Sequence, residues 1–191
     1  IEVFKPVEKY SDVDVETWII PGKGANFPRG YEMYKGGQLV AKAICNWALV
    51  DTVTGKLIAS KDYDMGTYSM DEAPELSIPR RFRIPKELKF QEVESSKVAM
   101  SMIDINMHMN NTVYASKLYD NIDDAEKYFI TSINLRYVHE APLGSEFKVY
   151  RSDAVDPGEM DYRAEKLIYF YTEADGMLNL EAAVGLKKVI I

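Results

Sequence analysis

The sequence predicts an α+β protein built mainly of antiparallel sheet, with a helix in its second half. Seven segments alternate apolar and polar residues with period 2, and one segment instead repeats its apolar residues at helical spacing. The order of the strand-like segments in the first 50 residues also recurs near the C-terminus. The composition agrees, since 47% of the 191 residues are hydrophobic, which excludes a disordered chain.

The predicted strands are rich in Val, Ile, Tyr and Phe, which favour a pleated sheet. In chain order they are residues 13–19, 29–34, 39–50, 130–138, 146–151, 164–172 and 178–188. Gly36-Gly37 joins the second segment to the third, and Asp175-Gly176 joins the last two. Both pairs suit tight turns that need positive φ, so we expect a hairpin at each.

The repeat becomes visible when residues 1–50 are laid beside residues 133–189. Ile1-Glu2-Val3 then matches Ile133-Asn134-Leu135, and the two hairpin turns coincide. A chance likeness between two antiparallel meanders is the alternative to a duplication. Duplication would place a further strand and helix before Ile1, because a helix precedes only the second copy.

That helix is predicted over residues 110–128, where four residues share one apolar face and Asn110 or Asn111 can cap the first turn. The four are Val113, Leu118, Ile122 and Ala125. Residues 71–89, between the copies, contain three prolines, which disfavour both helix and central strand. We expect this segment to be an extended linker.

Charge and composition exclude several classes of function. A formal charge of −7 argues against indiscriminate nucleic-acid binding, which depends on Lys and Arg. The apolar stretches fall short of the ~20 residues that span a bilayer, so no membrane span is expected. The single Cys45 cannot form an intrachain disulfide, which favours a cytosol or an organelle stroma. Besides Cys45, only His108 and His139 are soft or borderline metal ligands, and their spacing predicts no metal and no cofactor.

The most informative stretch is residues 104–111, where polar side chains alternate with Ile and Met. In an extended segment Asp104, Asn106 and His108 share one face, and the apolar face is expected to anchor the segment in a core. The helix that follows begins with N–H groups that lack intrahelical partners. A base can activate water, and an amide and the free N–H groups of a helix start can stabilise negative charge on a carbonyl oxygen. These groups together suit the attack of water on an acyl carbonyl. The alternative is that these residues form only a turn and a helix cap.

Two further features are candidates for function. Glu140 follows a strand and could point into a cleft, or it could be an ordinary exposed turn residue. The linker carries a basic cluster that could dock an acidic protein or simply be solvated. The cluster consists of Arg80, Arg81, Arg83, Lys86 and Lys89.

Residues 104–111 resemble the D-x-N-x-H-x-N-N sequence that enters the central helix of the second hot-dog domain in acyl-(acyl carrier protein) thioesterases. The likeness extends over most of the chain. It includes Val15-Glu16-Thr17-Trp18, residues 41–51 with Thr54-Gly55, and Tyr114.

This resemblance implies a double hot-dog fold, in which each antiparallel sheet wraps a central helix and the first of the two helices would precede Ile1. It implies an N-terminal domain over residues 1–70, a linker over 71–89 and a C-terminal domain with the active site over 90–191. The implied activity is hydrolysis of fatty acyl-acyl carrier protein, which releases free fatty acid and ends chain elongation. The bacterial cytoplasm or an organelle stroma is the implied compartment.

By the same resemblance Asp104, Asn106, His108 and Glu140 are catalytic, although two arginines precede the glutamate of plant members where this chain has Val138-His139. The expected substrate contacts are Asn110, Asn111 and Trp47. The implied partner is an acyl carrier protein with a phosphopantetheine-linked acyl chain, docked on the basic cluster, and the protein is expected to be a monomer or homodimer. An acyl-CoA thioesterase, a noncatalytic acyl-binding hot-dog module and a hot-dog dehydratase are the alternatives.

Overall fold

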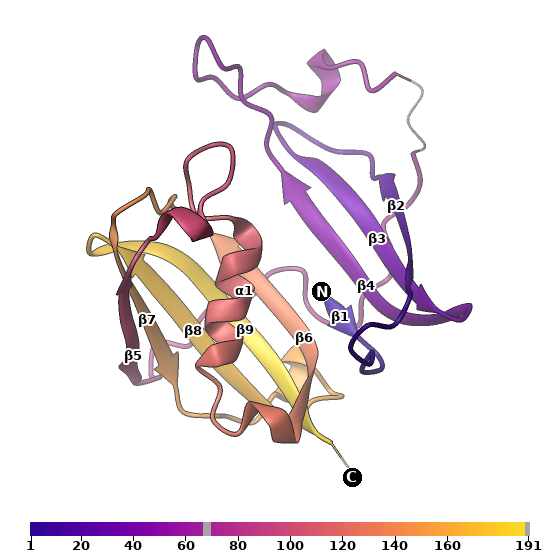
Figure 1. Ribbon diagram of the computed structural model, residues 1–191. Coiled ribbons are helices and arrows are strands. Elements are labelled where there is room, and N and C mark those ends of the chain that lie inside the picture. The colour runs from indigo at the N-terminus through magenta and orange to yellow at the C-terminus, as the bar shows by residue number, and fades with distance from the viewer. Residues whose placement is uncertain (67–69, 190–191) are drawn as a thin grey trace. The chain divides into compact units, whose positions relative to one another are not determined.

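The computed structural model describes residues 1–66 and 70–189, which form two compact units (Figure 1). Unit 1 comprises Ile1–Ser77 and unit 2 comprises Ile78–Ile191. The boundary between them falls inside the proline-containing stretch 71–89.

In the part of unit 1 that the structure describes, four strands form an antiparallel sheet in the order β2-β3-β4-β1. Its strands are β1 (Glu2–Val3), β2 (Asp14–Ile19), β3 (Phe27–Lys35) and β4 (Gln38–Trp47), and a 3₁₀ turn covers Ser60–Asp62. Gly36 and Gly37 join β3 to β4 with φ of +56° and +76°, which confirms the first predicted hairpin. Gly30 lies opposite Trp18, and a Cβ at this position would lie 2.6 Å from the indole ring.

Over the described residues 78–189, unit 2 is a five-stranded antiparallel sheet with one α-helix, α1 (Asn111–Asp120). Its strands, in the order β6-β9-β8-β7-β5, are β5 (Phe90–Lys97), β6 (Tyr128–Tyr137), β7 (Glu146–Ser152), β8 (Lys166–Ala174) and β9 (Met177–Lys188). Asp175 and Gly176 turn β8 into β9 with positive φ, as predicted. When the edge strand β5 is left aside, the strands of unit 2 follow the order β7-β8-β9-β6. The corresponding strands of unit 1 follow the order β2-β3-β4-β1, so the two units agree with the repeat in the sequence.

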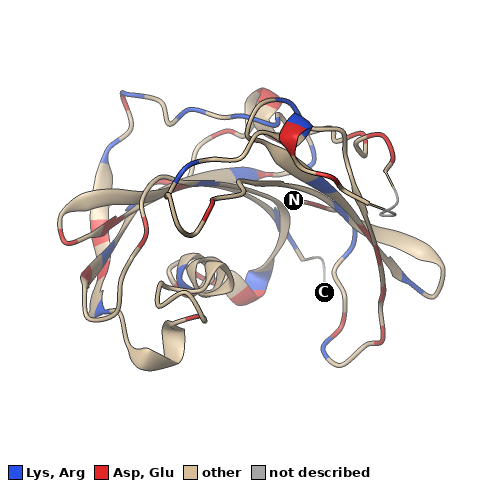
Figure 2. Ribbon diagram, turned by 90° about the horizontal axis from the view of Figure 1, so that it is seen from above, with Lys and Arg blue, Asp and Glu red and all other residues tan. Residues whose placement is uncertain are grey.

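Helix α1 lies on one face of the unit 2 sheet (Figures 1 and 2). Tyr114 and Leu118 of the helix are buried against apolar side chains of the strands, including Phe147 and Phe170, both fully buried. Removal of this apolar surface from water is the main force that holds the helix to the sheet. The described part of the unit also contains 3₁₀ turns at Met100–Met102, Ala125–Lys127 and Gly158–Met160.

Residues 78–89, which we call the strap, cover part of the opposite face of the same sheet. Phe82, Ile84 and Leu88 pack against Leu167 and Tyr169. Side chains alternate between the two faces along a strand, so Leu167 points to the strap while its neighbour Ile168 belongs to the core beneath α1. The strap therefore crosses the surface of unit 2 with its apolar residues anchored on the sheet.

Two element predictions are wrong. β5 was not expected, because this edge strand has polar residues at most positions and a bulge between Glu92 and Glu94, which together remove the period-2 signal. The helix ends at Asp120 rather than near residue 128. Asn121 ends it by donating its side-chain N–H to the Lys117 carbonyl at 2.9 Å, and Asp124 then adopts a left-handed φ of 54°.

In the part of the chain that the structure describes, no helix combines the length and the hydrophobicity needed to cross a lipid bilayer.

Candidate active site

The segment that carries the polar motif is a tight loop, and the predicted extended conformation is wrong. The Asp104 N–H donates to the His108 carbonyl at 2.9 Å, and the Met107 N–H donates back to the Asp104 carbonyl at 3.1 Å. The Asp104 carboxylate accepts the Asn106 N–H at 2.8 Å, and Met107 has a left-handed φ of 64°. These local bonds outcompete the extended form, because Asp and Asn side chains readily bond to backbone two residues away.

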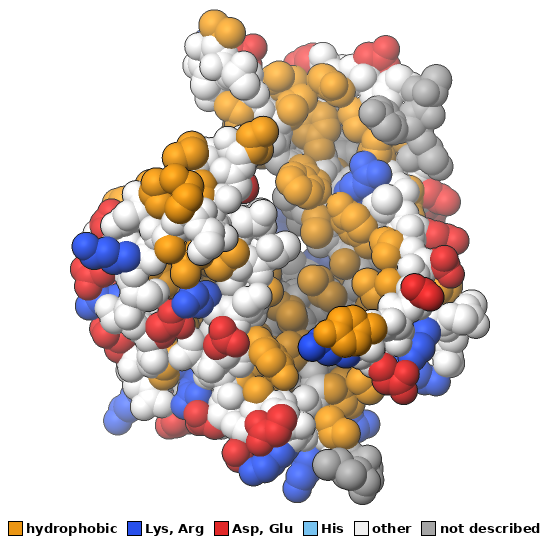
Figure 3. Space-filling view, in the orientation of Figure 1, with side chains coloured by type: hydrophobic (Ala, Val, Ile, Leu, Met, Phe, Trp, Pro, Cys, Tyr) orange, Lys and Arg blue, Asp and Glu red, His pale blue; other side chains and the backbone are white. Residues whose placement is uncertain are grey.

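The apolar residues of this loop do not anchor it as expected. Ile105 is 96% exposed and Met107 is 52% exposed, so both point into solvent. Apolar side chains accordingly gather at the surface where the loop lies (Figure 3). Ile103 and Met109, which pair across the base of the loop, provide the anchor instead, and Met109 is buried in the core beneath α1.

His108 is brought to Glu140 by backbone pairing. His108 forms an isolated bridge with Pro142, and the Met109 N–H donates to the Ala141 carbonyl at 2.9 Å. This pairing aligns the two segments so that His108 Nε2 lies 3.0 Å from Glu140 Oε2. The imidazole is 35% exposed and the carboxylate 70% exposed, so water reaches both groups.

The start of α1 closes the other side of the site. The Asn110 side chain accepts the Thr112 N–H at 2.9 Å and the Thr112 hydroxyl at 2.8 Å, which confirms the predicted cap. The Val113 N–H is bonded to the Asn110 carbonyl at 2.9 Å. Asn111, the first residue of the helix, therefore contributes the leading N–H group at the positive end of the helix dipole.

A cavity of about 270 Å³ lies between the loop, the helix start and the segment after β6. It is lined by Asp104, Asn106, His108, Met109, Asn111, Tyr114, Tyr137, Val138, His139 and Glu140. Asp104, Asn106, His108 and Glu140, the four catalytic candidates, thus share one cavity with Asn111.

Two expected substrate contacts are not among the residues that line this cavity. Asn110 uses its amide oxygen for the helix cap. Trp47 ends β4 in unit 1 and is 54% exposed. Within the described ranges 1–66 and 70–189, no group of three or more His, Cys, Asp or Glu side chains is arranged to hold a metal ion.

The cavity has an aromatic wall that the polar motif in the sequence did not indicate. The rings of Tyr114 and Tyr137 meet edge to face, with centroids 5.6 Å apart. Burial raises the pKa of Tyr114; the hydrogen bond from Asn179 opposes this shift and the nearby charge of Glu140 adds to it. The phenol is therefore a neutral O–H group at neutral pH.

Asn179 was missed because it lies 39 residues after Glu140, in a strand whose letters gave no functional signal. A polar residue between Leu178 and Leu180 of an apolar strand was the available clue. In β9 it is the extra residue of a bulge, since Leu178 pairs with Glu173 and Leu180 pairs with Thr172. Bulges re-aim side chains, and this one turns Asn179 inward.

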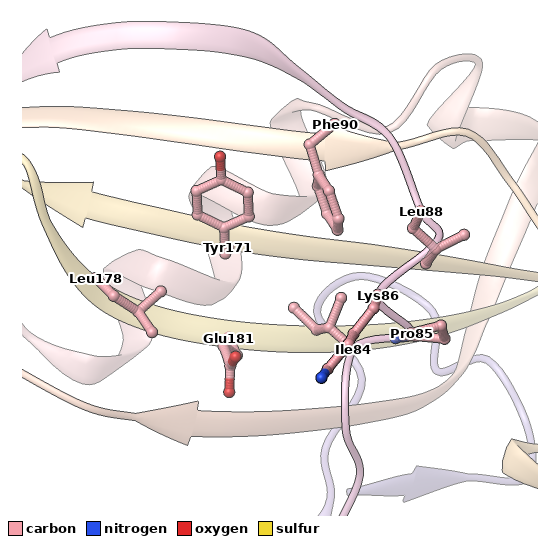
Figure 4. Close-up of a pocket in the computed structure, with 8 residues that line it drawn as sticks. All are labelled: Ile84, Pro85, Lys86, Leu88, Phe90, Tyr171, Leu178 and Glu181. Carbon is pink, nitrogen blue, oxygen red and sulfur yellow. The ribbon is translucent and has the colours of Figure 1, made fainter.

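A shallow groove of about 330 Å³ lies on the strap side of the sheet (Figure 4). Leu178 lines this groove, whereas its neighbour Asn179 contacts Tyr114 and His139, which line the cavity at the helix start, from within the core. Ile84, Lys86 and Leu88 of the strap form its other wall. The basic residues of the strap lie at least partly open to solvent: Arg80, Arg81, Arg83, Lys86 and Lys89.

The fold and the cavity together define unit 2 as a hot-dog domain with a polar site at the start of its helix. Residues 86–174 match the family model for the acyl-ACP thioesterase C-terminal domain. This part of the chain therefore belongs to the acyl-ACP thioesterase family.

Solved structures show the same fold at low sequence identity. The chain is similar to an acyl-ACP thioesterase from Bacteroides thetaiotaomicron, with a TM-score of 0.78 and 20% identity over 97% of this chain and 73% of the other. It is similar to the 12:0-ACP thioesterase from Umbellularia californica, with a TM-score of 0.70 and 17% identity over 93% of this chain and 66% of the other. No curated protein sequence matches the chain.

Proposed function

We propose that the protein hydrolyses the thioester of fatty acyl-acyl carrier protein. The observation that carries this proposal is the single cavity that holds Asp104, Asn106, His108 and Glu140 at the start of α1. Two carboxylates, an imidazole and an amide there meet the needs of water attack on an acyl carbonyl. Family membership of residues 86–174 supports the same substrate.

Asp104 is the proposed base. Its Oδ1 accepts the Asn106 N–H, which fixes the direction of the carboxylate before substrate binds. The carboxylate takes a proton as the water oxygen forms its bond to the carbonyl carbon. The C–S bond then breaks, the sulfur leaves with a proton as the carrier thiol, and the products are a fatty acid and the free carrier.

His108 and Glu140 act as a pair in this scheme. Glu140 holds the imidazole through Nε2 at 3.0 Å and favours a proton on that nitrogen. The oriented ring positions the water, and the proton that Asp104 takes from the water passes to the leaving sulfur. The contact with His108 supports a role for Glu140 in this scheme.

Negative charge on the thioester oxygen requires donors at the same place. The Asn111 N–H lies at the start of the helix beside the cavity, and the Asn106 amide lines it. These two groups are the proposed oxyanion donors. Their preorganisation is valuable because each such donor typically contributes ~10²- to 10³-fold in rate.

The cations of the strap are the proposed docking surface for the acidic carrier protein. They lie on the sheet face opposite α1, and the groove that Lys86 lines meets β9 at Leu178, one residue from Asn179. The carrier would then bind unit 2 close to the strand that supports the cavity.

We further propose that unit 1 is a second hot-dog domain that binds the acyl chain, with Trp47 among its contacts. The support is its strand order, β2-β3-β4-β1, which is that of the corresponding strands of unit 2. Apolar side chains are visible over the sheet of unit 1 in Figure 3.

The experiment is a hydrolysis assay with matched acyl chains of several lengths on acyl carrier protein and on coenzyme A. The proposal predicts faster turnover of the carrier-protein thioesters. Preference for acyl-CoA would instead identify an acyl-CoA thioesterase. Binding of acyl ligands without turnover of either carrier would identify a noncatalytic module.

A further inference from the structure

A buried asparagine lies behind the cavity and is not one of its lining residues. Asn179 is fully buried, with 0% of its surface exposed. Burial of an amide without partners costs about 1–3 kcal/mol on protein scales, so the bonds that satisfy it show what it is built to hold.

The side chain of Asn179 joins three parts of unit 2. Its Nδ2 donates to the His139 carbonyl at 2.5 Å and to the Tyr114 hydroxyl at 3.1 Å. Its Oδ1 accepts the Thr172 hydroxyl at 2.7 Å. A backbone carbonyl can only accept a hydrogen bond. The contact with the His139 carbonyl therefore shows that the Nδ2 end of the Asn179 amide faces residue 139.

The backbone of the same bulge also holds the segment that leads to Glu140. The Asn179 carbonyl accepts the Val138 N–H at 2.8 Å and the His139 N–H at 3.2 Å. The Leu178 carbonyl lies 2.8 Å from His139 Nδ1, which must therefore carry its proton. Residues 138 and 139 are thus bonded to two successive residues of β9.

This arrangement constrains Glu140 specifically. Glu140 follows His139 directly, and its own side chain is 70% exposed, so few packing contacts can set its position. The backbone before it is fixed by the bulge, and the backbone after it is fixed by the Met109 N–H bond to Ala141. The direction of Glu140 toward His108 is therefore set by its flanking backbone.

We infer that Asn179 is a positioning residue for the proposed thioester hydrolysis: it holds residues 138–139 and Tyr114 so that Glu140 meets His108 across the cavity. The predicted effect of Asn179 on turnover rests on the proposed function. The structural part of the inference, the hold on residues 138–139, stands on the hydrogen bonds alone.

The test compares Asn179→Asp with Thr131→Val. An aspartate keeps acceptors for Thr172 and Tyr114 but has no N–H to give the His139 carbonyl. Thr131→Val removes a different buried hydrogen bond, from Thr131 to Asp161 at 2.6 Å, outside the cavity. Asn179→Leu, of similar volume and without charge, is the second variant if the buried aspartate prevents folding.

Two readouts are measured on the whole chain: kcat and KM with an acyl carrier protein thioester, and amide hydrogen exchange at Val138 and His139. We expect the Asn179 variant to lose about 10- to 100-fold in kcat with little change in KM, because small misplacements of catalytic groups cost that much. Exchange at the two amides should rise about 10-fold or more, as expected for local loosening. Thr131→Val should change neither the kinetic constants nor the amide exchange at Val138 and His139.

Unchanged exchange at Val138 and His139 would overturn the inference, and so would an equal loss of kcat in Thr131→Val. If the parent protein hydrolyses no thioester, the proposed function fails. The exchange comparison would still decide whether Asn179 holds the segment.

Discussion

The Nε2 atom of His108 lies 3.0 Å from the Oε2 atom of Glu140, although the two residues are 32 positions apart. The pairing of residues 108–109 with residues 141–142 brings them together. Glu140 is 70% exposed and His108 is partly exposed, so the contribution of the pair to stability should be small, about 0–1 kcal/mol. The proposed function predicts instead that the His108–Glu140 pair has a large effect on turnover.

Replacement of either member of this pair should lower kcat by about 10²-fold, as for loss of a positioned acid–base group. His108→Gln and Glu140→Gln each remove one side of the contact, and the double variant should lose little more than either single variant, because the two act as a unit. Steady-state kinetics on one acyl carrier protein substrate measures this. Losses that multiply in the double variant would show that the residues act independently.

Docking on the strap predicts a specific dependence on salt. Exposed charges are screened within about 10 Å at 0.1 M salt, so KM for carrier-protein substrates should rise with salt far more than KM for acyl-CoA. Arg80, Arg81 and Arg83 changed together to Gln should raise KM for the carrier-protein substrate at low salt and flatten its salt dependence.

A matched control for the strap changes Lys23, Lys56 and Lys61, three exposed lysines of unit 1, to Gln. This control removes one positive charge at each of three sites, as the arginine variant does. Equal effects of the two triple variants on KM would indicate attraction by net charge and would reject the strap as the docking surface.

The link between β5 and α1 predicts a dependence of stability on pH. Burial raises the pKa of Glu94, but hydrogen bonds from Lys117, Asn121 and Ser96 outweigh burial, so the pKa lies below its ordinary value of 4.5. A lowered pKa in the folded state gives stability that is present above pH 4.5 and is lost as the pH falls through the folded value.

The corresponding test is the free energy of unfolding of the parent and of Glu94→Gln between about pH 3 and about pH 7. The parent should be more stable than the variant at neutral pH, and the difference should shrink toward the acid end. A difference that stays constant across this range would contradict the assignment.

Gly185 predicts a packing effect on stability. A Cβ at this position would lie 2.6 Å from Ser132 Oγ, 2.7 Å from Asp161 Oδ2 and 2.8 Å from Thr131 Oγ1. Asp161 is fully buried and bonded to Thr131, so these oxygens have little room to move. Gly185→Ala should therefore lower the free energy of unfolding by about 1–3 kcal/mol, as overpacking does. Chemical denaturation measures it, and an unchanged midpoint would contradict the rigidity of this cluster.

The sequence was most informative where one face of a strand is buried. Period-2 alternation located seven strands, and Gly36-Gly37 and Asp175-Gly176 located two hairpins, because turns with positive φ strongly favour Gly, Asn and Asp. The edge strand β5 escaped because its residues face solvent and carry no alternation. The helix was predicted too long because Ile122 is buried after the helix has ended.

The candidate site was partly predictable for a similar reason. Asp104, Asn106 and His108 were found because three polar residues in a short segment are visible in the letters. Their loop conformation was not, since it depends on a hydrogen bond from the Asn106 N–H to Asp104 and on a left-handed Met107. Asn179 could not be assigned, because only the register of β9 against β8 turns it toward the cavity.

The most direct test of the proposed function is the kcat of Asp104→Asn on an acyl carrier protein thioester. The asparagine side-chain oxygen can still accept the Asn106 N–H, so the loop should keep its shape while the carboxylate is lost. An unchanged unfolding midpoint with a loss of kcat of about 10²-fold or more is the predicted result. Near-parental turnover in this variant would contradict the central claim and reduce Asp104 to a residue that forms a turn.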